Sequence, residues 1–310
     1  MALRQDNFVD ALDPRFRRIE DQAYSEIPDQ IPNIFYMDPG SGQASERYSQ
    51  EGTVGELSDF TGTVTYDDTF EGYRAIVTPT EKASGLQIER KLWENVQSNL
   101  FKLDQKPRAL GSAAYRTRQS DGARLFNNAF SVDTKWLSHS EGVALCSNSH
   151  TTRSGDSTTA GFDNLVTSAL SSTSLTAAVI QMRQFRGDRA ERITIMPDEI
   201  LYPVDLYGTA YEIFESEGVP EDVINASNVH YQGYKSTVPK GWNYLTDTAD
   251  WFLMDSSMRK NGFGPIWIDK VKNEFAFVED IDTLIGKWRI YVYYGMGYVN
   301  WRWVLGANVS

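Results

Sequence analysis

The chain has 310 residues, enough for one large domain or two modest ones, and its net charge of −12 should repel nucleic acid over most of the surface. Its single cysteine, Cys146, excludes an internal disulfide and is typical of a reducing compartment. The sequence has no apolar signal core at its start and no run of ~20 apolar residues, so we expect a soluble protein made in a cytoplasm.

The first 50 residues predict a short helix followed by an extended arm. Apolar residues recur at roughly helical spacing within residues 1–24. Three prolines then interrupt residues 25–50, which favours extended backbone. Ile34, Phe35 and Tyr36 are nevertheless too apolar for a free tail. The arm must therefore lie against another surface, which is either its own body or a neighbouring chain.

Residues 51–85 predict a β-hairpin that has no core of its own. The segments Phe60–Tyr66 and Tyr73–Val77 both alternate apolar with polar residues, and residues 67–72 supply the turn chemistry between them. A lone two-stranded hairpin is only marginally stable in water. We therefore expect this hairpin, like the arm, to lean on another surface.

A basic, helical region follows the hairpin. The apolar stripe from residue 87 to residue 103 is the cleanest helical pattern in the chain, and Asp104–Pro107 predicts its end. Residues 86–130 hold eight Lys and Arg against four Asp and Glu. This excess indicates either a solvated helix face or a weak phosphate-facing strip.

A long helix is predicted over residues 108–131, and the rest of the chain is organised around it. Its ends are apolar, whereas Arg116, Arg118 and Arg124 lie in a middle that is too polar for a core, so we expect that middle to face solvent. Gly122 predicts a bend. A helix that is apolar only at its ends typically bridges two packed regions, and the alternative is two short surface helices.

The remaining chain mixes helices and strands without an internal repeat, which predicts an α+β fold. Residues 147–161 are rich in Ser, Thr and Gly and are expected to form an exposed loop. Helices are predicted over residues 174–185 and 206–215. Strands are predicted over residues 192–196, 234–238, 250–254, 265–269, 274–278, 287–294 and 298–304.

The sequence predicts no catalytic, cofactor or metal site. His139, His150 and His230 lack metal-ligand spacing, and no phosphate-binding glycine loop or nucleophile elbow occurs. Asp133, Ser138 and His139 can be drawn as a hydrolytic set. A chain of this size offers such trios by chance, so this interpretation is disfavoured.

A carbohydrate-binding or carbohydrate-active protein is the alternative from a different functional class. Asp280 and Asp282 lie beside aromatic strands, as glycosidase carboxylates do, although a turn between strands explains them more simply. An aromatic cluster could stack on sugars, although such clusters more often form a core or a subunit interface. This cluster consists of Trp288, Tyr291, Tyr293, Trp301 and Trp303.

A series of short motifs occurs in collinear order through most of residues 60–305. The motifs are Gly62–Asp68, Glu71–Tyr73, Gly85–Leu92, Leu125–Phe130, Gly142–Cys146, Ser174–Met182 and Met196–Pro197. Each is unspecific alone, and their order is the specific part. Together they resemble tailed-phage major capsid proteins of the Mu-type head-subunit group.

The resemblance implies the Hong Kong 97-like capsid fold, with an N-terminal arm, an extended β-hairpin loop, a long spine helix, and peripheral and axial domains. The implied ranges are 1–50 for the arm, 51–85 for the loop, 86–199 for the peripheral domain with spine helix 108–131, 200–270 for the axial domain, and 271–310 for strands that return to the peripheral domain. The implied candidates for contacts between subunits are Ile34, Phe35, Tyr36, Phe60, Tyr66, Asp67, Asp68, Tyr73 and Arg74, and the spine helix contributes Arg116, Arg118 and Arg124.

The resemblance also implies a function in the virion. Copies of the chain would assemble as pentamers and hexamers, in the bacterial host cytoplasm, into an icosahedral shell around double-stranded DNA. The implied partners are a portal protein, a separate scaffold, a decoration protein and, through weak non-specific contact, the packaged DNA, with no membrane. Residues 51–81 lack lysine, so covalent welding of neighbours through the loop is not expected. Removal of residues 1–40 is expected to leave a soluble body that cannot close shells, and an encapsulin-type compartment is the alternative shell.

Overall fold

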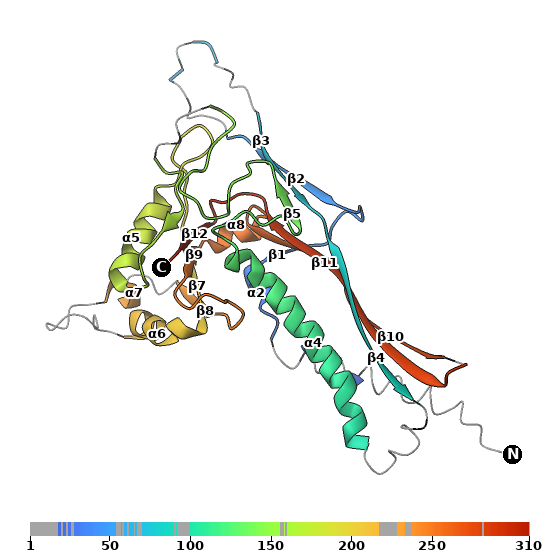
Figure 1. The fold of residues 1–310 in the computed structure, drawn as a ribbon. Helices are drawn as coiled ribbons and strands as arrows, with labels where there is room; N and C mark the ends of the chain where they lie inside the picture. Colours follow the sequence, from blue (N-terminus) through green and yellow to red (C-terminus); the bar gives the residue numbers. More distant parts are fainter. Residues whose placement is uncertain are drawn as a thin grey trace.

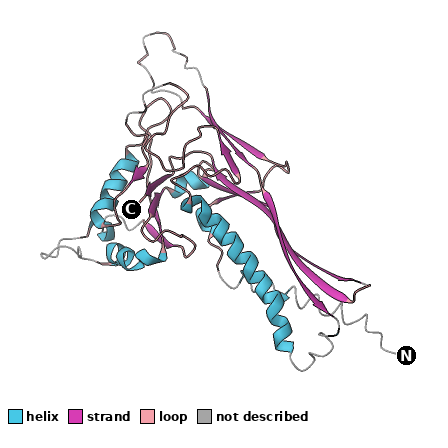
Figure 2. Ribbon diagram, in the orientation of Figure 1, coloured by secondary structure: helices cyan, strands magenta, loops and turns pink. Residues whose placement is uncertain are grey.

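Strands in the described part of the computed structural model form three sheets, and a 28-residue helix lies beside the longest of them (Figure 1). The structure describes residues 28–53, 70–89, 100–155, 160–216, 228–232, 237–280 and 282–309, with runs of one to three positions within 18–25 and 57–66 and single positions at 91 and 158. Helices and strands are interspersed along the chain, which confirms the predicted α+β class (Figure 2).

The longest sheet is built on a hairpin near the end of the chain. Strands β10 (Pro265–Asp280) and β11 (Ile285–Tyr298) pair antiparallel, and β4 (Thr80–Glu89) adds antiparallel to the other edge of β11. Strand β1 (Tyr36–Asp38) pairs in parallel with the start of β10. Two predicted strands merge into β10, because β-bulges absorb the polar residues between them.

A five-stranded sheet forms the centre of the molecule on the side of the C-terminus (Figure 1). Its order is β6 (Leu165–Val166), β12 (Val304–Ala307), β9 (Trp251–Met254), β7 (Glu199–Tyr202) and β8 (Val238–Gly241). The shorter helices lie on this side of the molecule. They are α5 (Ser172–Arg183), η1 (Val204–Leu206), α6 (Tyr207–Glu215), α7 (Val229–Gln232) and α8 (Ser256–Lys260).

Three predicted strands in this half of the chain are wrong or shifted. Residues 192–196 contribute only an isolated bridge from Arg192, because the chain there leaves Met196 exposed and the buried strand is β7. Residues 299–303 form an irregular turn between β11 and β12 rather than a strand. Strand β8 begins at Val238, and most of the predicted segment 234–238 lies outside the described residues.

The third sheet replaces the hairpin predicted within residues 51–85. Strand β3 (Glu71–Val77) pairs with β2 (Glu46–Glu51) on one edge and with β5 (Leu137–His139) on the other. The described positions within residues 60–66 are not in a strand, and residues 67–69 lie outside the described part. The alternation of apolar and polar residues does not by itself specify a strand there, because the apolar side chains described in that segment are exposed and bury no surface.

Helix α4 (Leu100–Asn127) is longer at its start than the sequence predicts. It continues through Pro107 instead of beginning after it, and it contacts β4 and β11. An interior proline costs about 3 kcal/mol, so this packing must offset the lost hydrogen bond. The helix predicted over residues 87–103 is wrong at its start, because residues 87–89 extend β4 and pair with β11, while residues 92–99 lie outside the described part.

The hydrophobic core lies where the three sheets meet the C-terminal end of α4. Phe126 occupies its centre, with edge-on ring contacts to Phe35, Trp242 and Trp303. The arm therefore packs on its own body, through the short helix α2 (Ile31–Ile34) and Phe35. Most of the helix predicted within residues 1–24 lies outside the described residues.

Gly122 has a different role from the predicted bend. A Cβ atom added at this position would lie 2.2 Å from Ile31 Cδ1 and 3.1 Å from the Trp242 ring. The absent side chain therefore lets the arm approach the backbone of α4 closely. This close approach explains why a residue with poor helix propensity stands in the middle of a long helix.

Candidate functional site

Part of the polar middle of α4 is buried, which corrects the expectation that all of it faces solvent. Arg118 is 5% exposed, and Gln119 and Asp121 are buried beside it. Burying charged groups is unfavourable unless partners satisfy them. Those partners come from segments far away in the sequence, so the helix pattern by itself could not reveal them.

Arg118 joins α4 to the long hairpin and to the arm. Its Nη1 and Nη2 donate to the two carboxylate oxygens of Asp269 at 2.6 and 2.8 Å, and its Nε donates to Asp29 Oδ2 at 3.1 Å. The guanidinium also lies 4.6 Å from the centroid of the Trp267 ring. Burial, the largest single influence, lowers the pKa of Arg118, but the hydrogen bonds to Asp269 together with the negative charges of Asp269 and Asp29 raise it overall. The side chain thus stays charged at the junction of three segments.

Gln119 completes this connection to the arm. Its Nε2 donates to Asp29 Oδ1 at 2.6 Å, and its Oε1 accepts the Trp242 indole N–H at 3.0 Å. Asp29 also accepts the backbone N–H of Ile31 at 3.0 Å. One carboxylate of the arm therefore fixes both the start of α2 and two adjacent side chains of α4.

Asp121 forms a second buried node on the same helix. It accepts the Tyr294 hydroxyl at 2.6 Å and Lys135 Nζ at 3.3 Å, and it pairs with Lys82 of β4. Lys135 lies over the Trp136 ring, 3.9 Å from its centroid. Burial, followed by the hydrogen bond to Asp121, raises the pKa of Tyr294, so its hydroxyl remains a donor.

The two other arginines of the predicted spine helix lie in different surroundings. Arg116 is exposed, as predicted. Arg124 donates to both oxygens of Asp133 at 2.6 and 3.0 Å, and Asn128 Nδ2 donates to the same carboxylate at 2.8 Å. Burial, the largest single influence, raises the pKa of Asp133, but the hydrogen bonds from Arg124, Asn128 and the Lys135 backbone together lower it overall. This fork fixes the turn that leaves α4.

The predicted subunit-contact residues divide into buried and exposed groups. Ile34 and Phe35 are both 2% exposed inside their own chain, so their side chains leave no surface for a neighbour, and their assignment as contact residues is corrected. Tyr36 is 36% exposed, whereas Phe60 and Tyr66 are 74% and 89% exposed.

Tyr73 and Arg74 lie on β3, and the loop acids lie outside the described part. The Tyr73 hydroxyl forms a 2.6 Å hydrogen bond with the Thr151 hydroxyl of the same chain, and the Arg74 side chain is exposed. Asp67 and Asp68 fall outside the described residues. Of the predicted contact residues, Phe60 and Tyr66 thus present the largest apolar surface to solvent.

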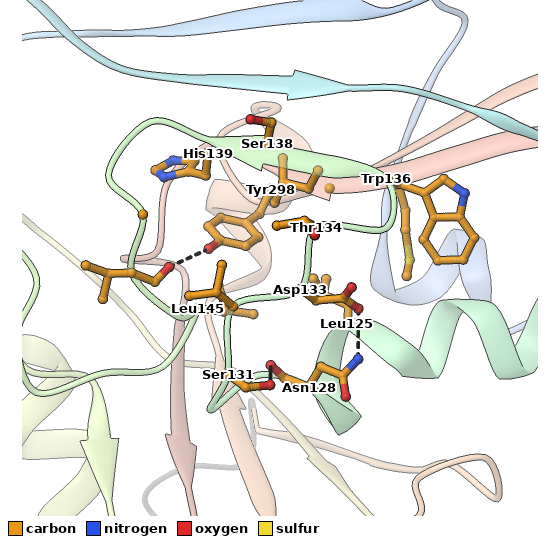
Figure 3. Close-up of a pocket in the computed structure, with 16 residues that line it drawn as sticks. Leu125, Asn128, Ser131, Asp133, Thr134, Trp136, Ser138, His139, Leu145 and Tyr298 are labelled. Atoms are coloured by element: carbon orange, nitrogen blue, oxygen red, sulfur yellow. Dashed lines mark hydrogen bonds between the residues drawn. The ribbon is translucent and has the colours of Figure 1, made fainter.

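A pocket opens beside the C-terminal end of α4, and Figure 3 shows the side chains around it. Asp133, Ser138 and His139 all line it, yet they do not form a hydrolytic relay. Asp133 is held by Arg124, and His139 Nε2 is 3.1 Å from the Val299 carbonyl oxygen. The geometry therefore agrees with the sequence analysis, which disfavours a hydrolytic triad of these residues.

A buried group of two histidines and one glutamate lies next to this pocket. His150 Nδ1 is 3.0 Å from Glu141 Oε1, and its ring stacks on Trp301 with centroids 4.3 Å apart. His139 Nδ1 is 3.9 Å from Glu141 Oε2 and forms no hydrogen bond within the described residues. His150 is thus buried, although the sequence predicts an exposed loop there. Burial, the largest single influence, raises the pKa of Glu141, but the hydrogen bond and charge of His150 together with the Thr151 backbone N–H lower it overall.

His139 should make stability depend on pH. Burial lowers its pKa from the ordinary value of 6.5, so between the two values the unfolded chain binds more protons than the folded chain. Its contribution is present above pH 6.5 and is lost as the pH falls through the folded pKa. The stability deficit of His139→Gln relative to wild type should therefore shrink as the pH falls from 7.5 to 5. Denaturant unfolding of both proteins across this range measures the deficit, and a constant deficit would contradict the prediction.

The residues behind the carbohydrate alternative do not form a sugar platform. Trp288, Trp301 and Trp303 are buried, so their ring faces are not open for stacking. Asp280 lies at the tip of the long hairpin, where Lys287 Nζ donates to it at 3.0 Å and its Oδ1 accepts the backbone N–H of Asp282. The turn interpretation of the two aspartates is thus supported.

Sequence reasoning missed Asp29, Asp269 and Trp267 as structural partners of α4. A signal existed for Asp269, because it follows Trp267 by two residues and so lies on the same face of the strand. A charged residue on a buried strand face implies a buried partner of opposite charge. Nothing local distinguishes Asp29 from an ordinary turn residue.

Within the described residues, no helix is both long and apolar enough to cross a bilayer. The same residues contain no cluster of three His, Cys, Asp or Glu side chains that could hold a metal ion. The geometry therefore offers a reinforced helix–hairpin unit, an apolar pocket and exposed aromatic side chains. These are features of contact surfaces rather than of catalytic sites.

Comparison with solved structures shows the fold. The capsid of bacteriophage JBD30 decorated with minor capsid protein trimers is 13% identical, with a TM-score of 0.53 over 71% of this chain and 92% of that chain. A chain of Mycobacterium phage Adephagia is 9% identical, with a TM-score of 0.52 over 89% and 88%. The SrpI encapsulin of Synechococcus elongatus PCC 7942 is 11% identical, with a TM-score of 0.51 over 92% and 89%. The chain thus has the Hong Kong 97-like capsid fold that the motifs imply.

The sequence itself also matches one family of known function. No curated protein sequence matches the chain. A model of the family described as phage capsid protein matches residues 72–307, which is most of its length. This match includes α4, the long hairpin and all strands of the central sheet. The chain therefore belongs to the phage capsid protein family.

Proposed function

We propose that this chain is the major head protein of a tailed bacteriophage, which assembles as pentamers and hexamers into an icosahedral shell around double-stranded DNA. The observation that carries the proposal is the family match over residues 72–307. The exposure of Phe60 and Tyr66 supports it, because large apolar side chains on an extended segment are typical of surfaces that a partner covers. The role is structural and involves no catalysis.

The proposed division of the chain follows the ranges implied by the resemblance. Helix α4 beside the β4, β10 and β11 sheet supports a peripheral domain with a spine helix (Figure 1). The central sheet joins the peripheral and axial parts, because β12 pairs with β9 across the proposed boundary at residue 270. The arm, residues 1–50, is proposed to contact neighbours through parts other than Ile34 and Phe35.

The proposed partners beyond the chain itself are a portal protein, a separate scaffold and a decoration protein. Contact with DNA is proposed to be weak and non-specific, because a net charge of −12 opposes close approach of phosphates. The absence of lysine from residues 51–81 supports a shell held by non-covalent contacts at this loop. Such contacts stabilise a shell collectively, since each one alone is modest.

An encapsulin-type compartment remains the second candidate because its fold is similar. The family match favours the phage shell. The two candidates differ in what the particle encloses, which is DNA in a phage head and enzyme cargo in an encapsulin. Neighbouring genes for a portal and a terminase would decide for the phage head.

Sedimentation of the purified full chain tests the proposal. We expect megadalton particles in equilibrium with smaller assemblies, and a glycan-binding screen without hits. Sedimentation only as the 35.1 kDa monomer at high concentration, with or without a co-expressed scaffold, would contradict shell assembly. Specific glycan binding by such a monomer would favour the carbohydrate alternative.

A further inference from the structure

The ring of His150 is held between two hydrogen-bond acceptors in the interior of the chain. Its Nδ1 lies 3.0 Å from Glu141 Oε1, and its Nε2 lies 3.1 Å from Asn164 Oδ1. The side chains of His150 and Glu141 are only 1% and 2% exposed, and Asn164 is fully buried. Both ring nitrogens therefore depend on these two partners rather than on solvent.

The side chain of Asn164 can only accept a hydrogen bond from this ring. Its Nδ2 donates to the carbonyl oxygens of Leu145 and Val304 at 2.9 and 3.0 Å, which uses both of its N–H bonds. Its Oδ1 also accepts the backbone N–H of Ser147 at 2.8 Å. Exchanging the amide oxygen and nitrogen would set acceptor against acceptor and donor against donor at these contacts. His150 Nε2 must therefore carry a proton and donate it.

The carboxylate of Glu141 is the acceptor at the other ring nitrogen. Its Oε1 also accepts the backbone N–H of Thr151 at 3.0 Å. Burial raises the pKa of Glu141, but the contacts with His150 and the Thr151 N–H lower it overall, so the carboxylate is ionised and has no proton to donate. With an acceptor at each nitrogen, the His150 ring needs two protons, which makes it a positively charged imidazolium.

His139 faces the same carboxylate but is neutral. Its Nδ1 lies 3.9 Å from Glu141 Oε2, and its Nε2 donates to the Val299 carbonyl oxygen, 3.1 Å away. Burial lowers the pKa of His139, which favours the uncharged ring. Glu141 therefore balances one charged histidine, His150, rather than two.

The remaining groups around His150 are compatible with a positive charge there. Trp301 stacks on the imidazole with ring centroids 4.3 Å apart, and an aromatic face attracts a cation. Arg302, a neighbouring buried cation, is neutralised by Asp188 at 3.0 Å. Burial raises the pKa of Tyr298 and Cys146, so both stay uncharged. The other titratable side chains that act on this cluster are Tyr73 and Glu191.

Residues 140–153 hold the start of β3, where the chain returns from the segment that follows β2 (Figure 1). The Thr151 hydroxyl forms a 2.6 Å hydrogen bond with the Tyr73 hydroxyl. Ser140 donates its backbone N–H to the Arg74 carbonyl oxygen at 2.9 Å, and its hydroxyl accepts the Arg74 N–H at 2.8 Å. The buried ion pair joins these two contact points, because its members are the direct chain neighbours of Ser140 and Thr151.

We propose that the Glu141–His150 ion pair is a proton-dependent latch, which fixes the base of the segment between β2 and β3 to the body of the chain. The latch is closed while His150 carries two protons. Loss of one proton at higher pH removes the donor from one of its two acceptors and leaves the Glu141 charge buried without a cation. The contacts that residues 140–153 make with β3 then loosen. Because the latch lies within one chain, it can be tested whether or not shells form.

Nitrogen-15 NMR of the histidine rings in the full, dissociated chain tests the protonation of His150. At about pH 7.5, both ring nitrogens of His150 should have the chemical shifts of protonated nitrogens, whereas His139 should have those of a neutral ring. The variants His150→Gln and His139→Gln assign the signals. An unprotonated nitrogen on His150 at this pH would overturn the proposal.

Amide hydrogen exchange of the dissociated chain tests whether the ion pair holds the segment. Glu141→Gln should speed exchange at β3 and at residues 147–153 by about tenfold, because glutamine leaves the His150 charge unbalanced. The matched control is Glu199→Gln, which removes a buried carboxylate paired with Lys240 and Arg259 in the central sheet and should leave exchange at those residues unchanged.

The wild-type chain gives the same test without a substitution. Raising the pH from about 7.5 to 9.5 should speed exchange at β3 and at residues 147–153 beyond the intrinsic effect of pH, because His150 loses a proton. Glu141→Gln should show no such excess, since its latch is already open. Equal exchange in wild type and Glu141→Gln, or a wild-type chain without the excess at high pH, would overturn the latch and leave the proposed function intact.

Discussion

Replacement of Arg118 by methionine should lower the free energy of unfolding of the free subunit by about 3–5 kcal/mol. The substitution keeps an apolar side chain of similar length over the Trp267 ring but removes the guanidinium. Asp269 then stays buried without the fork that neutralises it, and Asp29 loses one of its donors. Denaturant unfolding at a concentration where subunits are dissociated measures the loss.

Arg116→Met is the matched control, because Arg116 is exposed two residues earlier on the same helix. Its effect should stay within about 0.5 kcal/mol. Adding Asp269→Asn to Arg118→Met should recover part of the lost stability, since the uncompensated charge is then removed. Equal stability of the Arg118→Met and Arg116→Met variants would show that the buried network does not hold α4 to the hairpin.

The Phe35→Ala variant should lose about 3–5 kcal/mol of unfolding free energy, again in the free subunit. Phe35 is buried between Phe126 and Trp267, with ring centroids 6.4 and 5.6 Å away in edge-on geometry. Truncation leaves a cavity at the point where the arm, α4 and the long hairpin meet. The same denaturant experiment measures it, with Tyr36→Ala as the control on the adjacent, partly exposed residue.

Tyr36→Ala should cost about 1 kcal/mol or less, because Tyr36 is partly exposed whereas Phe35 is fully buried. An unchanged free subunit carrying Phe35→Ala, combined with failure of assembly, would mean that the arm packs on a neighbour instead. The burial of Phe35 also corrects the expectation for removal of residues 1–40. Such a truncation removes Asp29 and core residues of α2, so it should destabilise the subunit rather than leave a sound body.

Sequence patterns located part of the fold, including α4, α5, α6 and the strands β3, β9, β10 and β11, but not the partners of its polar residues. Helix α6 and strand β9 agree closely with their predictions, because local apolar spacing and turn residues suffice there. Residues 87–89 looked helical and are strand, since pairing with β11 outweighs local propensity. The sequence does not decide whether the arm packs on its own body or on a neighbouring chain. The structure shows that Ile34 and Phe35 pack in the core of their own chain.

The candidate site shows the same division between local and distant information. The exposure of Phe60 was predictable, because this apolar residue lies on a segment that has too few apolar residues to form a core of its own. The burial of Arg118 could not follow, because its partners Asp29 and Asp269 lie 89 and 151 residues away. Ion pairs between distant residues are specified by the tertiary fold. A polar helix face therefore looks solvent-exposed in the sequence, even when distant residues cover it in the folded chain.

Electron cryo-microscopy of particles formed by the full chain tests the central claim most directly. The account predicts closed icosahedral shells whose subunit density contains α4 alongside the β4, β10 and β11 sheet, with Phe35 inside its own subunit. A chain that stays a compact monomer at high concentration with a co-expressed scaffold, its exposed aromatic segment folded back on its own body, would contradict the account.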